Sequence, residues 1–274
     1  PLVRRKYRTT FHTMIRPLTT QDLTAAAQLT AGDRTALLGH LRWQLHTPYA
    51  STFIVQQGTA LVGVACCIKH TSSAHIGHVF IHPAHRRKGL GSVLVQHLSA
   101  HCEGNGCGTL ITQVPETDLG FWKAMGFHPQ GVYIRYSGGL HIDAHRDEVL
   151  LLEPPHTLAL LRLDERATGE DRRALLLEHR FVAHTYVEQG LVRGGLWPLL
   201  GHGLVLADSA AVGLELQRWL LPHQQHIVVP EANAAACAHL LERNYTPTSA
   251  GVRLVRGPLL PYRPELIYAW PWGL

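Results

Sequence analysis

The spacing of hydrophobic and polar positions predicts a mixed α/β domain in the first half of the chain. Short apolar runs predict strands at 15–18, 51–56, 60–68, 76–81, 109–114 and 131–136. Apolar residues at helical spacing predict helices at 23–29, 36–45, 91–101 and 119–125. Gln57-Gly58-Thr59 is typical of a hairpin turn between the second and third strands. The resulting order, β-α-α-β-β-β-α-β-α-β, ends near Gly138.

The second half repeats this pattern more loosely. Helices are expected at 171–189, 209–221 and 233–243, and strands within 196–206, at 226–229 and at 252–256. Between the halves, residues 139–157 contain Gly, Asp, Glu and two adjacent prolines, which is typical of a linker. The sequence therefore predicts a first domain at 14–138, a linker at 139–157 and a second domain at 158–274.

Composition and charge narrow the class of protein. Apolar residues make up 46% of the chain and charged residues 16%, which suits two packed cores rather than disorder. The net charge of +5 suits an anionic ligand, but no stripe of basic and aromatic residues indicates a nucleic-acid partner. No apolar run approaches the roughly 20 residues of a membrane span. We therefore expect neither nucleic acid nor membrane as a partner.

The cysteines and the N-terminus bear on the compartment. Five cysteines, an odd number in a chain of 274 residues, fit reduced thiols better than a disulfide framework. Residues 1–13 are basic but lack a following apolar segment, so they do not read as a signal peptide. Whether they are native or an extension stays open. The expected location is the cytoplasm.

The segment 79–94 combines features of a phosphate-binding loop. A strand runs into Pro83, a basic turn follows, and an apolar helix begins near Gly91. The first N–H groups of a helix lack partners and attract anions. Gly89 and Gly91 let a phosphate approach the backbone, and the cations of 86–88 lie beside it. This combination predicts a site for a pyrophosphate group.

Three segments in the first half follow one order of motifs. They are Leu61-Val62-Gly63-Val64-Ala65, Arg86-Arg87-Lys88-Gly89-Leu90-Gly91 and Phe121-Trp122-Lys123-Ala124-Met125-Gly126-Phe127. The second matches the Arg/Gln-x-x-Gly-x-Gly/Ala acyl-CoA motif of the GCN5-related N-acetyltransferase (GNAT) family. The first is similar to that family's third strand, and the third to its helix signature Phe-Tyr-Glu-Lys-x-Gly-Phe. The chain from Ile15 to Gly138 therefore resembles this family.

The resemblance implies a fold and a co-substrate. GNAT domains have a sheet that is splayed open between its fourth and fifth strands, with the pantetheine arm of acetyl-CoA in the gap. The backbone of the fourth strand would bind that arm, and the loop after it would wrap the pyrophosphate. By position, the implied acetyl-CoA-binding residues are Val79, Phe80, Ile81, Arg86, Arg87, Lys88, Gly89, Leu90, Gly91 and Ser92.

Acyl transfer to an amine needs a base and a donor to the oxyanion. His78, with an unperturbed pKa near 6.5, and Glu116, just past the next strand, are the two candidates for the base. Both are also ordinary polar residues for a strand end. The family implies a backbone amide of the fourth strand, that of Ile81, as the oxyanion donor.

The departing thiolate has no obvious acid in this sequence. In the family a Tyr of the helix signature protonates the sulfur, and Trp122 stands in its place here. An indole N–H is too weak an acid for that role. Tyr133 and Tyr136 on the following strand are candidate substitutes. The Asn that commonly precedes the helix signature is replaced by Pro115.

The high histidine content, 20 residues, invites a metal hypothesis. His97 and His101 lie one helical turn apart, with Cys102 and Cys107 nearby, and such residues can bind zinc. The glycine-rich break at 104–106 disrupts any fixed geometry, so no metal is expected.

The second half resembles a faded copy of the same family. Residues 229–245 keep an Asn-x-x-Ala element at Asn233, and 252–258 are similar to the end of the C-terminal domain of tandem members. Residues 199–208 occupy the place of the phosphate loop but lack its Arg and its Gly-x-Gly, and Asp208 would repel a phosphate there. We expect a GNAT-like domain that binds no CoA.

Two functions follow from these observations. The first is transfer of an acetyl group from acetyl-CoA to the amine of a small molecule, with the second domain covering the acceptor side. The alternative is a non-catalytic acyl-CoA-binding regulatory module, which the substitution at Trp122 and the missing Asn motivate. A homodimer stays open.

Overall fold

The computed structural model describes residues 13–141 and 146–272, so most of the basic N-terminal segment lies outside it. The chain divides into two compact units. The first comprises the described residues up to Cys67 together with His78–His101, and the second comprises Ile68–Gly77 and the described residues from Cys102 onward. Each unit therefore draws on separate stretches of the chain. The boundaries predicted at 14–138, 139–157 and 158–274 stay a prediction.

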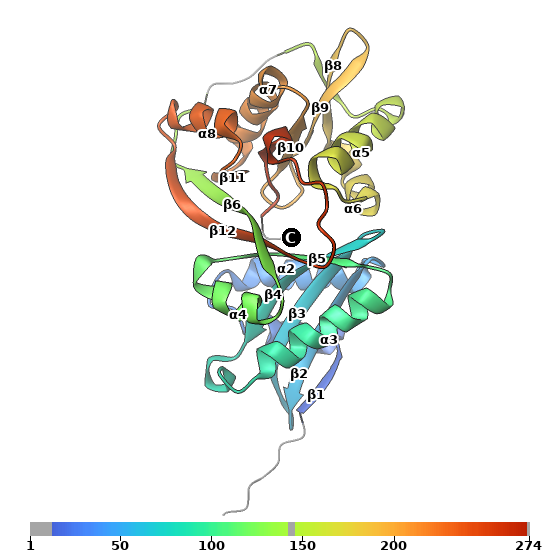
Figure 1. The fold of residues 1–274 in the computed structure, drawn as a ribbon, viewed down its shortest axis with the longest axis vertical. Helices are drawn as coiled ribbons and strands as arrows, with labels where there is room; N and C mark the ends of the chain where they lie inside the picture. Colours follow the sequence, from blue (N-terminus) through green and yellow to red (C-terminus); the bar gives the residue numbers. More distant parts are fainter. Residues whose placement is uncertain (1–12, 142–145, 273–274) are drawn as a thin grey trace, which may run out of the picture. The chain divides into compact units, whose positions relative to one another are not determined.

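The first unit contains an antiparallel arrangement of strands (Figure 1). Its strands are β1 (Thr13–Pro17), β2 (Ala50–Gln57), most of β3 (Ala60–Lys69) and the last residues of β4 (Ser73–Ile81). β1 pairs with β2 in the register Thr13↔Gln57 to Pro17↔Phe53. The hairpin predicted at Gln57-Gly58-Thr59 joins β2 to β3, and Gly58 has a φ of 61° there.

Helices cover both faces of these strands. They are α1 (Leu23–Ala27), α2 (Arg34–His46) and α3 (Leu90–Gly104). Successive side chains of a strand point to opposite faces. Ile54 therefore packs into the core that includes Leu41 of α2. Its neighbour Phe53 instead meets the imidazoles of His97 and His101 on α3, at ring separations of 4.7 and 5.0 Å.

The second unit contains a sheet in which the last long strand of the chain is inserted between two earlier ones. The strand order is β5 (Thr109–Val114), β12 (Thr246–Arg256), β6 (His128–Ser137) and β11 (His226–Pro230). β12 pairs antiparallel with both β5 and β6, and Val252 lies opposite Val114 on one side and Val132 on the other. The sequence predicts the strand at 252–256, but a local pattern carries no information about such distant partners.

A second sheet and the α-helices from α4 onward complete the part of this unit that the structure describes. The sheet order is β13 (Ile267–Ala269), β10 (Leu204–Ala207), β9 (Leu191–Trp197), β8 (His184–Glu188) and β7 (Val149–Leu151). The helices are α4 (Leu119–Ala124), α5 (Pro154–Thr168), α6 (Arg173–Glu178), α7 (Ala210–Leu220) and α8 (Ala234–Leu241). One buried core joins Leu216 of α7, Leu240 of α8, Val205 of β10 and Val229 of β11.

The long helix predicted at 171–189 is wrong. Helix α6 ends at Glu178, a 3-10 turn spans Arg180–Val182, and the chain then forms strand β8. Gln189 and Gly190 both have positive φ angles, 50° and 78°, as a tight hairpin turn between β8 and β9 requires. This turn fixes 184–188 as a strand, although its apolar residues also fit a helical pattern.

The predicted linker also contains regular structure. β7 lies within it, and α5 begins at Pro154, where the two adjacent prolines occupy the first helical positions. Proline is well tolerated there, because its missing N–H has no acceptor in the first turn. Gly169, with a φ of 73°, ends the helix in the left-handed conformation. None of the helices in the described ranges is long and apolar enough to cross a membrane.

Candidate functional site

The loop between β4 and α3 has the backbone shape of an anion-binding turn. After Ile81 a short 3-10 turn, Pro83–His85, leads into the basic stretch, and α3 begins at Leu90. Arg87 and Gly89 have left-handed φ angles of 59° and 80°. Glycine adopts this conformation without strain, whereas other residues rarely do. The chain therefore turns sharply at these two residues, just before the helix begins.

The first turn of α3 presents unbonded amide groups. The N–H of Val93 donates to the carbonyl of Gly89 at 3.1 Å and makes the first hydrogen bond of the helix. The N–H groups of Leu90, Gly91 and Ser92 precede it and have no acceptor within the helix. These donors, with the positive end of the helix dipole, form a site suited to phosphate oxygens.

Basic side chains hold the loop in place and add positive charge. Arg86 donates from Nε to the carbonyl of Ile81 at 3.0 Å, and Lys88 donates from Nζ to the carbonyl of Ala84 at 2.8 Å. Both side chains are exposed, as is that of Arg87. Each uses part of its donor capacity on the loop itself, and an anion can engage the rest. The side chains of 86–88 thus form a cationic, solvent-exposed surface just before the helix.

The residues predicted to bind the pantetheine arm lie at the end of β4. The parallel ladder of β4 with β5 runs from Ser73↔Thr109 to Ile76↔Thr112. Val79, Phe80 and Ile81 follow the last pair of this ladder and are partly buried. They belong to the same compact unit as the loop. The structure thus brings all ten predicted acetyl-CoA-binding residues into one unit; their role stays a prediction.

His78 lies in the same unit, on β4. Its φ of 51° is unusual for a residue with a side chain, and such backbone strain is often found at functional positions. Burial lowers the pKa of His78 to about 4, so the imidazole is neutral at pH 7. Its Nδ1 is buried and has no hydrogen-bond partner among the described residues. Its ring stacks on that of His40 at 4.1 Å.

Glu116 and Tyr133 belong to the other unit. Glu116 is exposed at the start of a 3-10 turn and accepts a hydrogen bond from Ser249 Oγ at 3.3 Å. Tyr133 is fully buried on β6, and its hydroxyl lies 2.9 Å from that of Tyr262. Burial, followed by the neighbouring Tyr262, raises the pKa of Tyr133 well above its usual value. Its phenol therefore stays protonated and is a poor acid.

Trp122 and Tyr136 are buried as well. Trp122, at the position of the family tyrosine, packs edge-on against Phe121 and Phe127 at ring separations of 5.4 and 5.0 Å. Burial also raises the pKa of Tyr136. Neither side chain gains an acidic proton from its surroundings.

The histidines considered for a metal have other partners. His97 and His101 pack on Phe53, and the His101 Nε2 lies 3.1 Å from Ser51 Oγ. Within the described ranges, the groups whose ligand atoms come within 4.8 Å of one another are His40–Cys66–His78 and His70–His75–Glu170. Neither group can be predicted from the sequence, because their members are far apart in the chain or carry no motif.

The second unit contains a polar cluster that the sequence did not predict. Glu170, fully buried, accepts hydrogen bonds from Ser73 Oγ at 2.7 Å and from His75 Nε2 at 3.0 Å. Arg253 of β12 donates to it at 3.3 Å. Nearby, the buried Arg172 donates from Nε to Asp164 at 3.1 Å. Only the arrangement of β12 and of the segment after α5 brings these groups together.

Part of the chain is similar to a known protein family. Residues 15–127 match the model of the acetyltransferase (GNAT) family. No curated protein matches the chain. The matched residues lie in the first half of the chain and include the motif at 86–91.

Solved structures extend the likeness over nearly the whole chain. A putative acetyltransferase from Pyrococcus horikoshii is 18% identical, with a TM-score of 0.80 over 97% of both chains. A GCN5-related N-acetyltransferase from Sphaerobacter thermophilus is 15% identical, with a TM-score of 0.64 over 91% of this chain and 98% of that one. A tandem GNAT protein from the clavulanic acid biosynthesis pathway is 16% identical, with a TM-score of 0.58 over 90% of this chain and 100% of that one.

These identities define a shared fold. The predicted fold class, a GNAT fold followed by a GNAT-like second half, is confirmed.

Proposed function

We propose that this protein transfers an acetyl group from acetyl-CoA to the amine of a small molecule. The observation that carries the proposal is the loop after β4, where the left-handed Gly89 leads directly into the unbonded amides of Leu90, Gly91 and Ser92. The cationic side chains of 86–88 surround these amides. A pyrophosphate carries the charge and the acceptor oxygens that such a turn satisfies.

His78 is the proposed general base. Its pKa is lowered to about 4, so the ring is unprotonated at neutral pH and its nitrogen is free to take up a proton, directly or through water, although the low pKa makes it a weaker base than an ordinary imidazole. Glu116 is the alternative, because an exposed carboxylate at a strand end can accept the same proton through water. The backbone N–H of Ile81 is the proposed oxyanion donor.

Tyr133 is the proposed donor to the departing sulfur. Its raised pKa keeps the phenol protonated, so it can offer a hydrogen bond to a thiolate even though it is a weak acid. A thiol with a pKa near 8.5 is a tolerable leaving group with such limited help. The second half supplies no second CoA loop in this proposal, since Asp208 at the corresponding place pairs with Arg193 at 2.6 Å.

A turnover assay tests the proposal. The purified protein is mixed with acetyl-CoA and each member of a panel of small amines, and the release of CoA thiol is followed with a thiol reagent. The proposal predicts release that requires both the amine and the protein. The second candidate, a non-catalytic acyl-CoA-binding module, is favoured by the buried Trp122 at the family tyrosine position. It predicts saturable acetyl-CoA binding with no release for any amine.

A further inference from the structure

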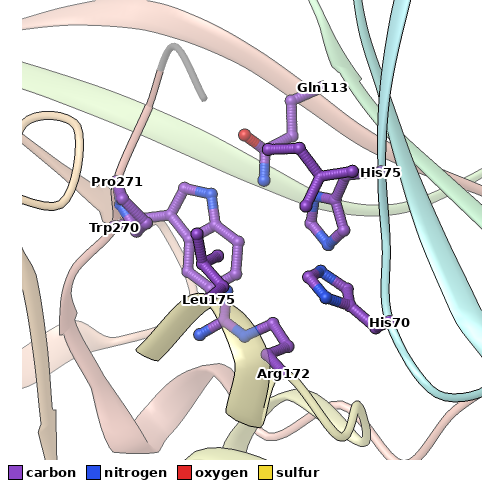
Figure 2. A pocket seen from close by; sticks show the side chains of 8 residues that line it. His70, His75, Gln113, Arg172, Leu175, Trp270 and Pro271 are labelled. Atoms are coloured by element: carbon purple, nitrogen blue, oxygen red, sulfur yellow. The ribbon is translucent and has the colours of Figure 1, made fainter. Parts of the chain in front are cut away.

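The second unit holds a small pocket (Figure 2). Two buried polar atoms in its wall have no hydrogen-bond partner among the described residues. The pocket lining includes His70, His75, Gln113, Arg172, Leu175 and Trp270. In Figure 2 the two imidazoles lie on one side of the pocket and the indole of Trp270 on the other, with the Gln113 amide and Arg172 at opposite ends. All belong to the same compact unit.

Two buried polar atoms in this wall are unsatisfied. Gln113 Nε2 and His70 Nδ1 have no hydrogen-bond partner among the described residues. A buried polar group without a partner costs about 1–3 kcal/mol, so its presence in a folded protein calls for an explanation. Because the amide nitrogen of Gln113 can only donate, the missing partner must offer an acceptor oxygen.

Arg172 gives the wall its positive charge. Its guanidinium uses Nε and Nη2 to donate to Asp164 and lies over the indole of Trp270, 4.9 Å from the ring centroid. This leaves Nη1 for another acceptor. Asp164 and Glu170 are almost completely buried and do not line the pocket. The lining residues therefore include a guanidinium, two imidazoles and an amide, and no carboxylate.

A metal ion fits this site less well than an anion. His70, His75 and Glu170 bring ligand atoms within 4.8 Å of one another. However, the Glu170 carboxylate already accepts from Ser73, His75 and Arg253. A cation would have to displace the proton of His75 and lie beside the guanidinium of Arg253. It would also leave the Gln113 amide without an acceptor.

We propose that this pocket binds the carboxylate group of a small molecule. Gln113 Nε2, His70 Nδ1 and Arg172 Nη1 are the donors to its oxygens, and the faces of Trp270 and Leu175 contact its carbon atoms. This inference concerns binding within the second unit. It does not depend on acyl transfer by the first.

The test is a titration followed by NMR. Protein labelled with ¹⁵N is titrated with sodium acetate, with acetamide and with sodium chloride, and the side-chain NH₂ signals of Gln113 are followed. They are assigned by their loss in Gln113→Leu. Acetate should shift these signals saturably, with a dissociation constant in the roughly millimolar range that suits a four-atom ligand. Acetamide, which lacks the charge of acetate, and chloride, which lacks its shape, should not shift these signals.

Variants then locate the site. Gln113→Leu, observed through the indole N–H signals, should weaken acetate binding about tenfold. Gln96→Leu, the same change at an exposed residue of α3, should leave it unaltered. The wild-type contrast between acetate and acetamide is also followed through the indole N–H signals, so it stands even if Gln113→Leu does not fold. Equal shifts with acetate and chloride, or unchanged binding in Gln113→Leu, would overturn the proposal. Stoichiometric binding of Zn²⁺ that shifts the His70 and His75 signals would overturn it too.

Discussion

The imidazole rings of His40 and His78 stack with their centroids 4.1 Å apart and their planes at 29°. Burial, and then the neighbouring His78, lowers the pKa of His40 to about 3. The His40 Nε2 lies 2.7 Å from the amide nitrogen of Gln44, which donates to it, so the ring is held neutral from this side as well. Two charged rings at this separation would repel each other. The two rings are therefore not both charged at the same time in the folded protein.

This pair predicts a pH-dependent stability. Between the lowered pKa values, about 3 and 4, and the value of about 6.5 expected for an unfolded histidine, the unfolded chain binds protons that the folded chain excludes. Stability should therefore fall as the pH decreases from 6.5 toward 4. In His40→Phe one such group is removed. The slope of the free energy of unfolding against pH should therefore decrease by about 1.4 kcal/mol per pH unit near pH 5.

Urea unfolding between pH 4.5 and 7.5 measures this slope. The control is His46→Gln, which changes an exposed histidine at the end of the same helix and should leave the slope as in the wild type. An identical slope in His40→Phe and wild type would show that His40 is charged in the folded protein.

The backbone conformation of Gly89 predicts a specific loss of cofactor binding. A Cβ at Gly89 would meet no atom within 4 Å, but the φ of 80° is strained for alanine. Gly89→Ala should therefore destabilise the native conformation of the loop by about 1 kcal/mol or more. It should weaken acetyl-CoA binding about tenfold. Gly106→Ala is the matched control, because Gly106 has a φ of 87° and equally open surroundings outside the loop. Calorimetric titration of both variants distinguishes them; equal affinities would place the cofactor elsewhere.

The proposed base predicts a kinetic difference between two variants. His78→Asn keeps a residue that tolerates a positive φ but removes the imidazole. It should lower kcat about 100-fold and leave the dissociation constant of acetyl-CoA unchanged, since general-base catalysis contributes at least that factor. Glu116→Gln should change kcat less than threefold. The reverse ranking of the two variants would assign the base to Glu116.

The buried charge of Glu170 predicts a large effect on stability. Burial by itself would raise its pKa, but the charge and hydrogen bond of His75 and the charge of Arg253 hold that pKa well below the usual value. Glu170→Gln leaves Arg253 buried without its counter-charge, so the free energy of unfolding should fall by about 3–5 kcal/mol. Glu265→Gln removes the exposed pair with Arg263 and should cost under about 1 kcal/mol. Chemical denaturation compares the two, and a loss below 1 kcal/mol in Glu170→Gln would contradict this role.

The sequence predicted most of the first half because its signals are local. The strands, the hairpin at Gly58 and the glycine-rich loop at 86–91 follow from neighbouring residues. The insertion of β12 between β5 and β6 does not, since Val252 and Val114 are far apart in the chain. The same limit hid the donors around Glu170.

The helix predicted at 171–189 failed for another reason. Its apolar residues fit two periodicities, and the turn at Gln189 and Gly190 decides between them. Two successive positive φ angles occur where two strands form a hairpin. The periodicity of apolar side chains does not predict such a turn.

The central claim is that the loop after β4 binds acetyl-CoA through its backbone amides. Calorimetric titration of the wild-type protein with acetyl-CoA, repeated at several salt concentrations, tests it most directly. We predict saturable binding of one molecule per chain, weakened by salt because the loop is cationic. No heat of binding at millimolar acetyl-CoA, in protein whose fold is intact by circular dichroism, would contradict the account.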